Sequence, residues 1–363
     1  MRVAILWTRL SGYMNACMRE LAGRDNVEIS VIHEAAGGEA PFEESMFGWI
    51  ANRYVWSARP DSDSVMKRMH LFSPDILIIS GWHIPAYRRV AKAQHNKSLR
   101  VMAMDNQWSG TFKQRIGALF APFYVQPIAD MAWVPGDRQA VFARKLGFEQ
   151  HAILRGLYTC NYPAFEEVYR RRSASTPRAP RSFLYVGRFS TEKGLDTLVE
   201  AYELYRKANI MPWPLVCCGA GSLRHLLEGQ PGIHVEGFVQ PQRLPDLLTS
   251  AGCLVLSSVF EPWALVIHEA VSAGLPVLAS ESAGAAVHLV QPGYNGFIFT
   301  RRNAEALANY MSRISAMSDI QLTAMGRASH CLSQQFSPQK WTDTLLDAYS
   351  CAAQTGGCSR MPE

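Results

Sequence analysis

Short apolar runs alternate with amphipathic segments along the whole chain, and this alternation predicts strands and helices in turn. In the first half the predicted strands are Val3–Trp7, Val27–His33, Ile76–Ser80, Arg100–Met104 and Met131–Val134, with a helix over Asn15–Gly23. In the second half they are Ser182–Val186, Pro214–Cys218, Ile233–Glu236, Cys253–Ser257 and Pro276–Ala279. Helices are expected between these later strands, over Leu195–Lys207, Leu244–Ser250 and Ala264–Ala273. Strand, helix and strand at this spacing favour an α/β fold with parallel sheets covered by helices on both faces.

The segment 169–181 interrupts the alternation, because it is basic, rich in Ser and Pro, and has no apolar period. We interpret it as a linker, since a chain of 363 residues exceeds the usual size of one domain. The expected architecture is two Rossmann-like doubly wound domains, over residues 1–168 and 182–337, facing each other across a cleft. Residues 338–353 are predicted to form a helix that packs back towards the first domain, and residues 354–363 a frayed tail.

Composition and charge narrow the function classes. A hydrophobic content of 48% with 18% charged residues is typical of a globular protein. The net charge of +5 suits phosphate-bearing ligands or an anionic membrane surface, but no long Lys/Arg stripe indicates nucleic acid as a partner.

The eight cysteines show no CxxC or zinc-finger spacing, and several lie in apolar runs. Buried reduced thiols, and hence a cytoplasmic location, are expected. No apolar stretch reaches the roughly 18 residues of a membrane-spanning helix, and the first apolar run is too short for a signal peptide.

Two loops after predicted strands are suited to phosphate. In Gly187-Arg188-Phe189-Ser190-Thr191-Glu192-Lys193-Gly194, two cations stand at a strand end beside a helix N-terminus, where free amides already favour an anion. Arg188 can bind a diphosphate through two hydrogen bonds and Lys193 as a point charge, although two solvated loop cations remain the alternative. Gly219 and Gly221 permit close backbone approach to a phosphate or sugar. Arg224 occupies the third glycine position of a dinucleotide fingerprint, so an NAD site is not favoured.

The most informative stretch runs from Ser257 to Ala270. Glu261 precedes a helix that Pro262 is suited to begin, and its carboxylate can accept hydrogen bonds from hydroxyl groups. Glu269 is expected roughly on the same side of that helix. Taken singly, either glutamate is equally compatible with an ordinary helix surface.

These segments together resemble the retaining GT-B glycosyltransferases of family 4. The spacing Gly-Arg-x4-Lys-Gly is followed by a line similar to that family's EPFGL…EA…G-x-P-V signature, beginning Glu261-Pro262-Trp263-Ala264-Leu265-Val266. Further matches are Gly237-Phe238-Val239 and Gly293-Tyr294-Asn295-Gly296-Phe297. The resemblance is specific over about Phe183–Phe299 and only architectural before it.

The resemblance implies transfer of a sugar, with retention of configuration, from a UDP, GDP or ADP sugar to a sugar or lipid-linked acceptor. Glycan, polysaccharide or glycolipid biosynthesis is the expected setting. Arg188 and Lys193 would hold the diphosphate, and Glu269 the ribose hydroxyls. Glu261 would hold the transferred sugar together with the backbone amides of Trp263, Ala264 and Leu265, and Phe238 would line the base pocket. Relatives need no metal, no DxD motif is present, and no cofactor is expected.

The match has two departures, and other functions stay open. Trp263-Ala264 replaces the commoner Phe-Gly, and Ser282–His288 lacks the usual Gly-Gly followed by Glu. A nucleotide-sugar epimerase or hydrolase on the same scaffold is one alternative, and a non-catalytic nucleotide-sugar-binding subunit is another.

Acceptor recognition is expected in the first half. Gly12 is a candidate for close approach to the donor phosphates, or an ordinary turn glycine. His83 follows the third predicted strand and is a candidate catalytic residue, or a packed loop histidine. Asp105 ends the next predicted strand and could face the acceptor. The segment Phe112–Ile128 mixes cations with large apolar residues. A buried helix and loop is the favoured interpretation, and peripheral contact with the inner face of a membrane is the alternative.

Overall fold

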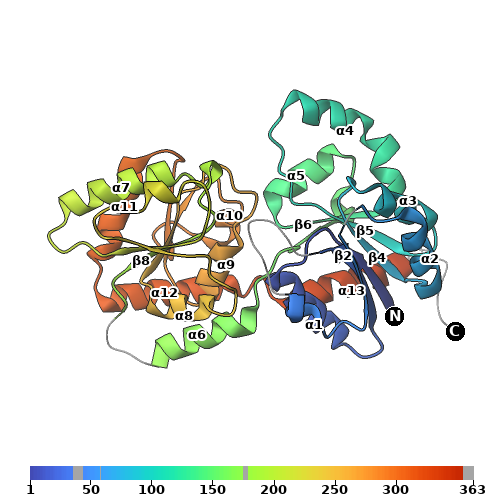
Figure 1. Cartoon of the computed structure of the whole chain (residues 1–363), viewed down its shortest axis with the longest axis horizontal. Coiled ribbons are helices and arrows are strands. Elements are labelled where there is room, and N and C mark those ends of the chain that lie inside the picture. The colour runs from blue at the N-terminus through green and yellow to red at the C-terminus, as the bar shows by residue number, and fades with distance from the viewer. Residues whose placement is uncertain (36–43, 58, 175–178, 355–363) are drawn as a thin grey trace. The chain divides into compact units, whose positions relative to one another are not determined.

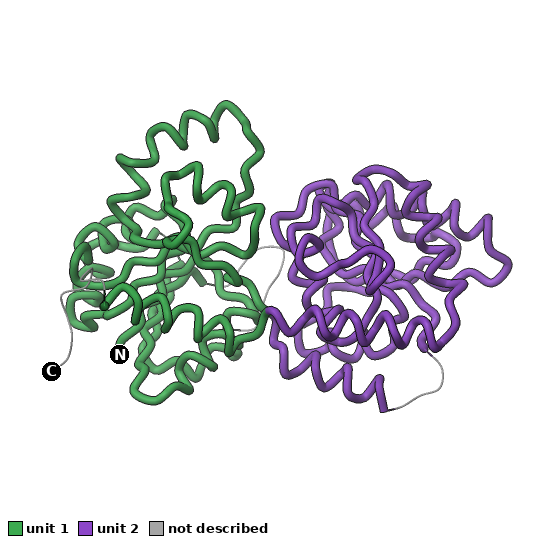
Figure 2. The backbone as a smooth tube through the Cα atoms, turned by 180° about the vertical axis from the view of Figure 1, so that it is seen from behind, with its two compact units in different colours: residues 1–159, 336–363 green, residues 160–335 purple. Residues whose placement is uncertain are grey.

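The computed structural model describes residues 1–35, 44–57, 59–174 and 179–354 (Figure 1). The chain forms two compact units, coloured separately in Figure 2. Unit 1 contains Met1–Thr159 and Phe336–Glu363, and unit 2 contains Cys160–Gln335.

Unit 1 is built on a seven-stranded sheet in the order β3-β2-β1-β4-β5-β6-β7, with every neighbouring pair parallel. Its strands are β1 (Arg2–Leu6), β2 (Glu28–Glu34), β3 (Asn52–Trp56), β4 (Ile76–Ser80), β5 (Leu99–Ala103), β6 (Met131–Val134) and β7 (Ile153–Arg155). Its α-helices are α1 (Gly12–Ala22), α2 (Ser62–Phe72), α3 (Pro85–Ala93), α4 (Phe112–Tyr124), α5 (Asp137–Lys145) and α13 (Pro338–Gln354). Alternate residues of β1 belong to two different core clusters, because successive side chains of a strand point to opposite faces.

The last helix, α13, completes the core of unit 1. Trp341 stacks on Trp133 with ring centroids 4.5 Å apart, and its indole Nε1 donates to the carbonyl of Leu157 at 3.0 Å. Leu345 is fully buried in the same cluster. The tail predicted over 354–363 lies, from residue 355, outside the described residues.

Unit 2 has a six-stranded sheet in the order β10-β9-β8-β11-β12-β13, also parallel throughout. Its strands are β8 (Phe183–Val186), β9 (Leu215–Cys218), β10 (Ile233–Glu236), β11 (Cys253–Leu256), β12 (Val277–Ser280) and β13 (Gly296–Phe299). Its α-helices are α6 (Tyr162–Ala174), α7 (Leu195–Ala208), α8 (Leu244–Ser250), α9 (Leu265–Ser272), α10 (Ala286–Leu289), α11 (Ala304–Ser315) and α12 (Asp319–Ser333).

The structure changes the domain boundary. The prediction of a linker over 169–181 is wrong for residues 169–174, which end helix α6, and unit 2 begins at Cys160. The basic run indicates a solvated linker, but one of its cations binds backbone carbonyl groups of the neighbouring helix. Arg172 donates from one guanidinium nitrogen to the carbonyls of Leu248, Thr249 and Ala251, at 2.8 to 3.0 Å, and so satisfies the end of α8.

The favoured interpretation of Phe112–Ile128 as a buried helix and loop is also wrong for its helical part. Within α4 only Ala121 is buried, whereas the large apolar side chains are exposed. The helix contacts the core through Ala121 and Tyr124 instead.

Candidate active site in two sheet edges

In unit 2, β8 and β11 mark the point where the strand order reverses. The chain passes from β8 to β9 on one side, whereas β11 lies on the other. Parallel α/β sheets bind ligands at the carboxyl ends of strands at such a point. These two strand ends lead directly into the segments that carry Arg188 and Lys193, and Glu261.

Lys193 and Glu261 meet in an ion pair between these strand ends. The Lys193 Nζ donates to Glu261 Oε2, and the two side chains are only 13% and 12% exposed. The hydroxyl of Ser258 also approaches Glu261 Oε2, at 3.4 Å. A cation and a carboxylate therefore meet at these strand ends, and their attraction is strong because each has limited access to water.

Backbone contacts fix this pair. Gly194 adopts a left-handed φ of 63°, and a Cβ there would lie 2.3 Å from the Ser257 carbonyl oxygen, so only glycine fits. The Ser257 hydroxyl donates to the carbonyl of Lys193 at 2.9 Å. The amides of Val259 and Phe260 donate to the carbonyl of Glu192 at 2.9 and 3.2 Å. The two loops are thus held together before any ligand binds.

Arg188 lies beside the pair and is more exposed, at 52% of its side chain. It forms an ion pair with Glu192 at 2.9 Å, and Glu192 also accepts a hydrogen bond from the Ser190 hydroxyl at 2.7 Å. The Ser190 hydroxyl, followed by backbone and cationic neighbours, lowers the pKa of the Glu192 carboxyl. Glu192 therefore stays charged and orients the guanidinium.

Helix α9 begins at Leu265, one residue later than predicted. Ala264 is left-handed, with φ 79° and ψ 75°, and so it stands outside the helix. Trp263, only 3% exposed, packs near His288 with ring centroids 5.7 Å apart, and its carbonyl accepts from the Ala285 amide at 2.7 Å. The amides of Leu265 and Val266 open α9 and therefore have no carbonyl partner within the helix.

Glu269 lies one turn inside α9 and is partly buried. Burial raises the pKa of its carboxyl to about 7. Within the described part of the chain, its carboxylate makes no hydrogen bond or ion pair. An acceptor in this state is suited to the two hydroxyls of a diol.

The predicted glycines pack against backbone. A Cβ on Gly219 would lie 1.9 Å from the Gly187 carbonyl oxygen, and one on Gly221 would lie 2.4 Å from that of Phe189. The loops after β8 and β9 therefore need these glycines to touch each other. Phe238 follows β10 and is 37% exposed. The Gly219 amide donates to the carbonyl of the preceding Gly237 at 3.0 Å, so Phe238 lies at the same edge of the sheet as the loop after β9.

Unit 1 has a cavity of about 410 Å³ at the corresponding reversal of its sheet, between β1 and β4. Aromatic and hydroxyl-bearing side chains dominate its lining. The lining residues are Trp7, Thr8, Arg9, Tyr13, Ser80, Gly81, Trp82, His83, Ala103, Met104, Asp105, Asn106, Leu157 and Tyr158.

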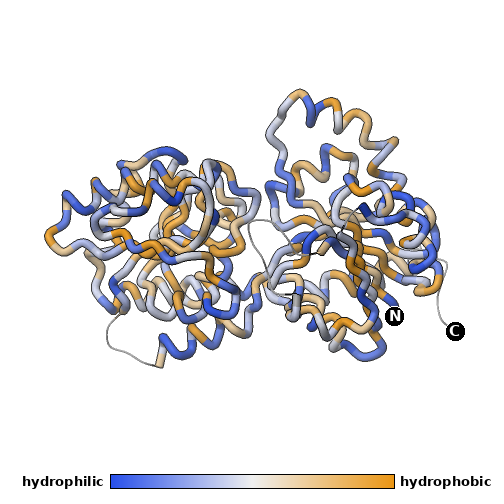
Figure 3. Tube along the Cα trace, viewed as in Figure 1, coloured by the Kyte–Doolittle hydropathy of each residue, from blue (hydrophilic) through white to orange (hydrophobic). Residues whose placement is uncertain are grey.

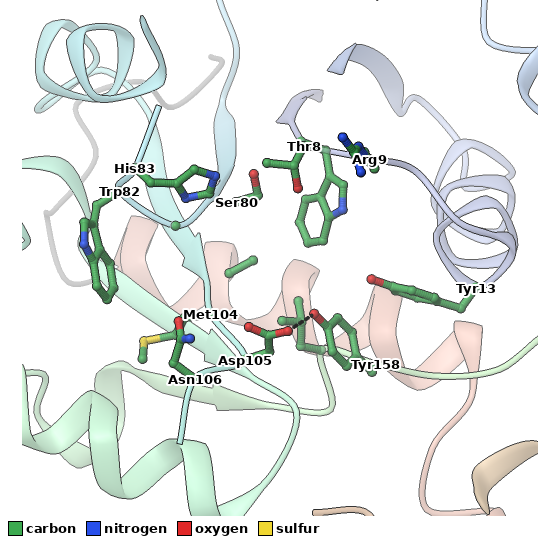
Figure 4. A pocket seen from close by; sticks show the side chains of 14 residues that line it. Thr8, Arg9, Tyr13, Ser80, Trp82, His83, Met104, Asp105, Asn106 and Tyr158 are labelled. Carbon is green, nitrogen blue, oxygen red and sulfur yellow. Dashed lines mark hydrogen bonds between the residues drawn. The ribbon is translucent and has the colours of Figure 1, made fainter. Parts of the chain in front are cut away.

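One carboxylate in this cavity is held by a partly buried phenol. Tyr158 donates to Asp105 Oδ2 at 3.0 Å, and the Tyr158 ring meets Tyr13 edge-on with centroids 4.9 Å apart. Burial, followed by the charges of its neighbours, raises the pKa of Tyr158 well above its usual range. Figure 4 shows this pair across the cavity from His83, Ser80 and Thr8. A protonated phenol leaves the remaining Asp105 lone pairs free to accept from a hydroxyl group.

The other two predicted residues of this half occupy different places. His83 is exposed and lines the cavity. Gly12 is the first residue of α1 and is not among the lining residues. The cavity thus brings His83 and Asp105 together, whereas the sequence pattern did not single out Tyr13, Tyr158 or Glu192. Glu192 lies between Arg188 and Lys193 in the sequence, and this position alone could have indicated that it pairs with one of them.

The second unit carries the match to a known family. Residues 170–329 match the family described as Glycosyl transferases group 1, a range that contains Arg188, Lys193, Glu261 and Glu269. An uncharacterized glycosyltransferase of Methanocaldococcus jannaschii, MJ1607, is 27% identical over 200 residues, covering 53% of this chain and 50% of that protein. The lipopolysaccharide core biosynthesis glycosyltransferase LpsE of Rhizobium meliloti is 29% identical over 181 residues, covering 48% and 52%. The chain thus spans about half the length of the curated relatives it matches.

A solved structure matches both units. The Anabaena protein Alr3699/HepE, crystallised in complex with UDP, aligns with a TM-score of 0.74 at 17% identity, covering 97% of this chain and 100% of that one. The chain therefore has the Rossmann-like two-domain fold of GT-B glycosyltransferases, and its second unit is similar to glycosyl transferases group 1.

Proposed function

We propose that this chain is a retaining, metal-independent glycosyltransferase that moves a sugar from a nucleoside diphosphate sugar to a hydroxyl acceptor. Glycan, polysaccharide or glycolipid synthesis is the proposed setting. The observation that carries the proposal is the contact between Lys193 and Glu261 at the adjacent ends of β8 and β11. The match to glycosyl transferases group 1 supports it.

The contact supports a role for each residue on one side of the bond that breaks. In this proposal Lys193 and Arg188 hold the diphosphate, whereas Glu261 and the first amides of α9 hold the sugar hydroxyls. Because Lys193 and Glu261 touch, the bond between the sugar carbon and the β-phosphate oxygen lies beside both. Negative charge grows on the phosphate as that bond breaks, and a fixed cation there stabilises the transition state.

Retention follows from where the acceptor attacks. The acceptor oxygen forms its bond to the sugar carbon on the face from which the diphosphate leaves, and its proton passes to the departing β-phosphate oxygen. Neither Glu261 nor Glu269 needs to form a covalent intermediate. The two cations and the α9 amides supply the positive charge that a metal supplies elsewhere.

In this proposal, unit 2 binds the ribose and base of the donor, and unit 1 binds the acceptor. Glu269 accepts from the ribose hydroxyls, since its carboxylate has no protein partner within the described residues. Phe238 lines the base pocket. In unit 1, the cavity around Asp105 and Tyr158 receives the acceptor, because aromatic faces and a carboxylate suit a hydroxyl-rich molecule.

A donor panel tests the proposal. Thermal unfolding is measured with UDP, GDP and ADP sugars, beginning with UDP because the related Anabaena structure contains it. One class is expected to raise the unfolding temperature by mass action. Transfer is then followed in the presence of a chelator, and the anomeric configuration of the product is read by NMR. An inverted product or loss of transfer on chelation contradicts the mechanism, and donor consumption without acceptor identifies a hydrolase instead.

A further inference from the structure

Helix α4 of unit 1 carries a stripe of exposed apolar side chains. Their exposed fractions are 78% for Phe112, 42% for Ile116, 72% for Leu119, 53% for Phe120 and 76% for Phe123. At the helical period these five positions fall within an arc of about 100°. Figure 3 shows hydrophobic residues along this helix, which stands away from the sheet at the top of Figure 1.

On the opposite face of α4 lie the small residues Gly117 and Ala121, together with the partly buried Tyr124. Ala121 is fully buried, and Gly117 faces Tyr124, whose hydroxyl donates to the Gly117 carbonyl at 2.8 Å. A helix that packs on a core normally turns its large apolar side chains inwards. Here the arrangement is reversed, so packing within unit 1 does not account for the large residues.

Hydrogen bonds hold the first turn of α4 in place. The Thr111 hydroxyl caps the helix by accepting from the Gln114 amide at 3.3 Å. The Gln114 side chain accepts from the Ser109 amide at 2.7 Å and donates to the Gln107 carbonyl at 2.9 Å. These contacts hold the first turn to the loop that leads from the cavity residue Asn106.

Positive charge surrounds the stripe. Lys113 and Arg115 lie on its two sides, at the helical period, and α4 contains no acidic residue. The neighbouring helix α3 adds Arg88, Arg89 and Lys92, also without an acid. These three line a cavity of about 310 Å³ that includes Tyr124 at the end of α4. Within the described residues, Asp63 lies 2.7 Å from Arg89. The pKa of Asp61 is lowered by hydrogen bonds from Ser64 and, to a smaller extent, by the charge of Arg89.

We propose that α4 binds the surface of an anionic lipid bilayer, with its apolar stripe inserted and the cations of α3 and α4 on the lipid phosphates. At about 1.5 Å per residue, the 13-residue helix is about 20 Å long, shorter than a bilayer core of roughly 30 Å, so it lies along the interface. Among the described helices, none has the length and hydrophobicity to cross a membrane. A symmetric contact with a second copy is disfavoured, because it would bring five cations against the same five.

Vesicle flotation of the full chain tests this inference, independently of the proposed transfer reaction. Binding is measured to vesicles of phosphatidylglycerol and phosphatidylcholine in equal amounts and to phosphatidylcholine alone. We expect binding to the anionic vesicles to be at least about tenfold tighter, and to weaken with added salt.

Paired variants separate the two contributions. The double variant Leu119→Ser/Phe123→Ser should lose about tenfold or more of the binding, since both exposed side chains leave the lipid. Lys113→Gln/Arg115→Gln should lower the preference for anionic vesicles by about fivefold per charge. The matched control is Ile210→Ser/Met211→Ser, which removes two side chains of unit 2 that are 102% and 86% exposed, and it should bind like the wild type.

Three outcomes would overturn the inference. They are absence of binding, equal binding to both vesicle types, and equal losses in the α4 and control variants. Sedimentation velocity without vesicles tests whether a second copy of the chain covers the stripe instead of a bilayer. A wild-type dimer that Leu119→Ser/Phe123→Ser converts to monomers, with no vesicle binding, would assign the stripe to self-association.

Discussion

The reversal points of the two sheets have the same topology but different side chains. Between β8 and β11 the edge is ionic, with Lys193 paired to Glu261 and Arg188 paired to Glu192. Between β1 and β4 the edge holds a cavity of about 410 Å³, whose lining combines aromatic rings with polar side chains, and no two of these described lining residues form an ion pair with each other. The parallel fold provides the place in both units, and the residues that follow each strand determine what binds there.

The two edges also hold their carboxylates differently. In unit 2 a cation neutralises Glu261 directly. In unit 1 a neutral phenol donates to Asp105, and burial keeps the pKa of that phenol, Tyr158, above its usual range. The first arrangement suits a ligand with its own negative charge, and the second suits a neutral hydroxyl. If this contrast is functional, damage to unit 2 affects the donor and turnover, whereas damage to unit 1 affects the acceptor.

The largest expected effect is that of Lys193→Ala. Removing the cation beside the breaking bond should lower kcat by about 10²- to 10³-fold. The matched control is Lys207→Ala, which breaks an exposed pair with Glu203 on α7 and should leave turnover unchanged. Initial rates at saturating donor measure both, with thermal unfolding as the check on folding. Equal turnover in the two variants would remove Lys193 from the site.

The next effect is a pH dependence set by Glu269. Burial raises the pKa of this carboxyl to about 7, and only the ionised form accepts two ribose hydroxyls. Donor affinity should therefore fall about tenfold per pH unit below 7 in the wild type. Glu269→Gln should bind donor weakly and with a flat profile between pH 5 and 8. A wild-type profile equally flat would show that this carboxylate does not contact the donor.

Stability gives Glu269 a second, ligand-free readout. Between its unfolded pKa of about 4.3 and its folded pKa of about 7, the native state holds a proton that the unfolded state has lost. The free energy of unfolding therefore decreases as pH rises through this window. Glu269→Gln should be more stable than the wild type above pH 7 and no more stable at pH 4. Urea unfolding at the two pH values measures the difference.

A smaller effect is expected in unit 1. Asp105→Ala should raise the acceptor KM by about tenfold, because the hydroxyl it receives loses a charged acceptor. The donor dissociation constant should not change, and neither constant should change in the exposed control Asp25→Ala. A change confined to donor affinity would reverse the assignment of the two edges.

The ionic edge could be predicted from sequence better than the aromatic one. Arg188, Lys193 and Glu261 are charges at strand ends, and such charges stand out from the apolar runs that precede them. Tyr158 follows β7, a three-residue strand too short to give a pattern, so nothing indicated that it reaches Asp105. Pairing distances across a cavity depend on tertiary structure, which local pattern does not contain.

The same limit explains the errors in the fold. Long buried strands such as β4 (Ile76–Ser80) were predicted with their observed ends, since continuous apolar runs are typical of parallel sheets. The edge strand β3 was missed because its residues are exposed or only partly buried and therefore mixed in polarity. The exposure of α4 could not be predicted, because an apolar stripe in a sequence does not tell whether the stripe faces the core or the solvent.

The smallest expected effect concerns Ala264, where the sequence departs from the glycine of the family signature. Its left-handed φ of 79° is unfavourable for a residue with a Cβ. Ala264→Gly should therefore raise the free energy of unfolding by about 0.5 to 1 kcal/mol, the relief of strain exceeding the entropic cost of glycine. Ala308→Gly, inside helix α11, is the matched control and should lower it by a similar amount. Urea unfolding at neutral pH compares them. Opposite signs would identify strain that is retained beside the first amides of α9, which the proposed function assigns to the donor sugar. Equal losses would mean that the backbone of Ala264 is unstrained.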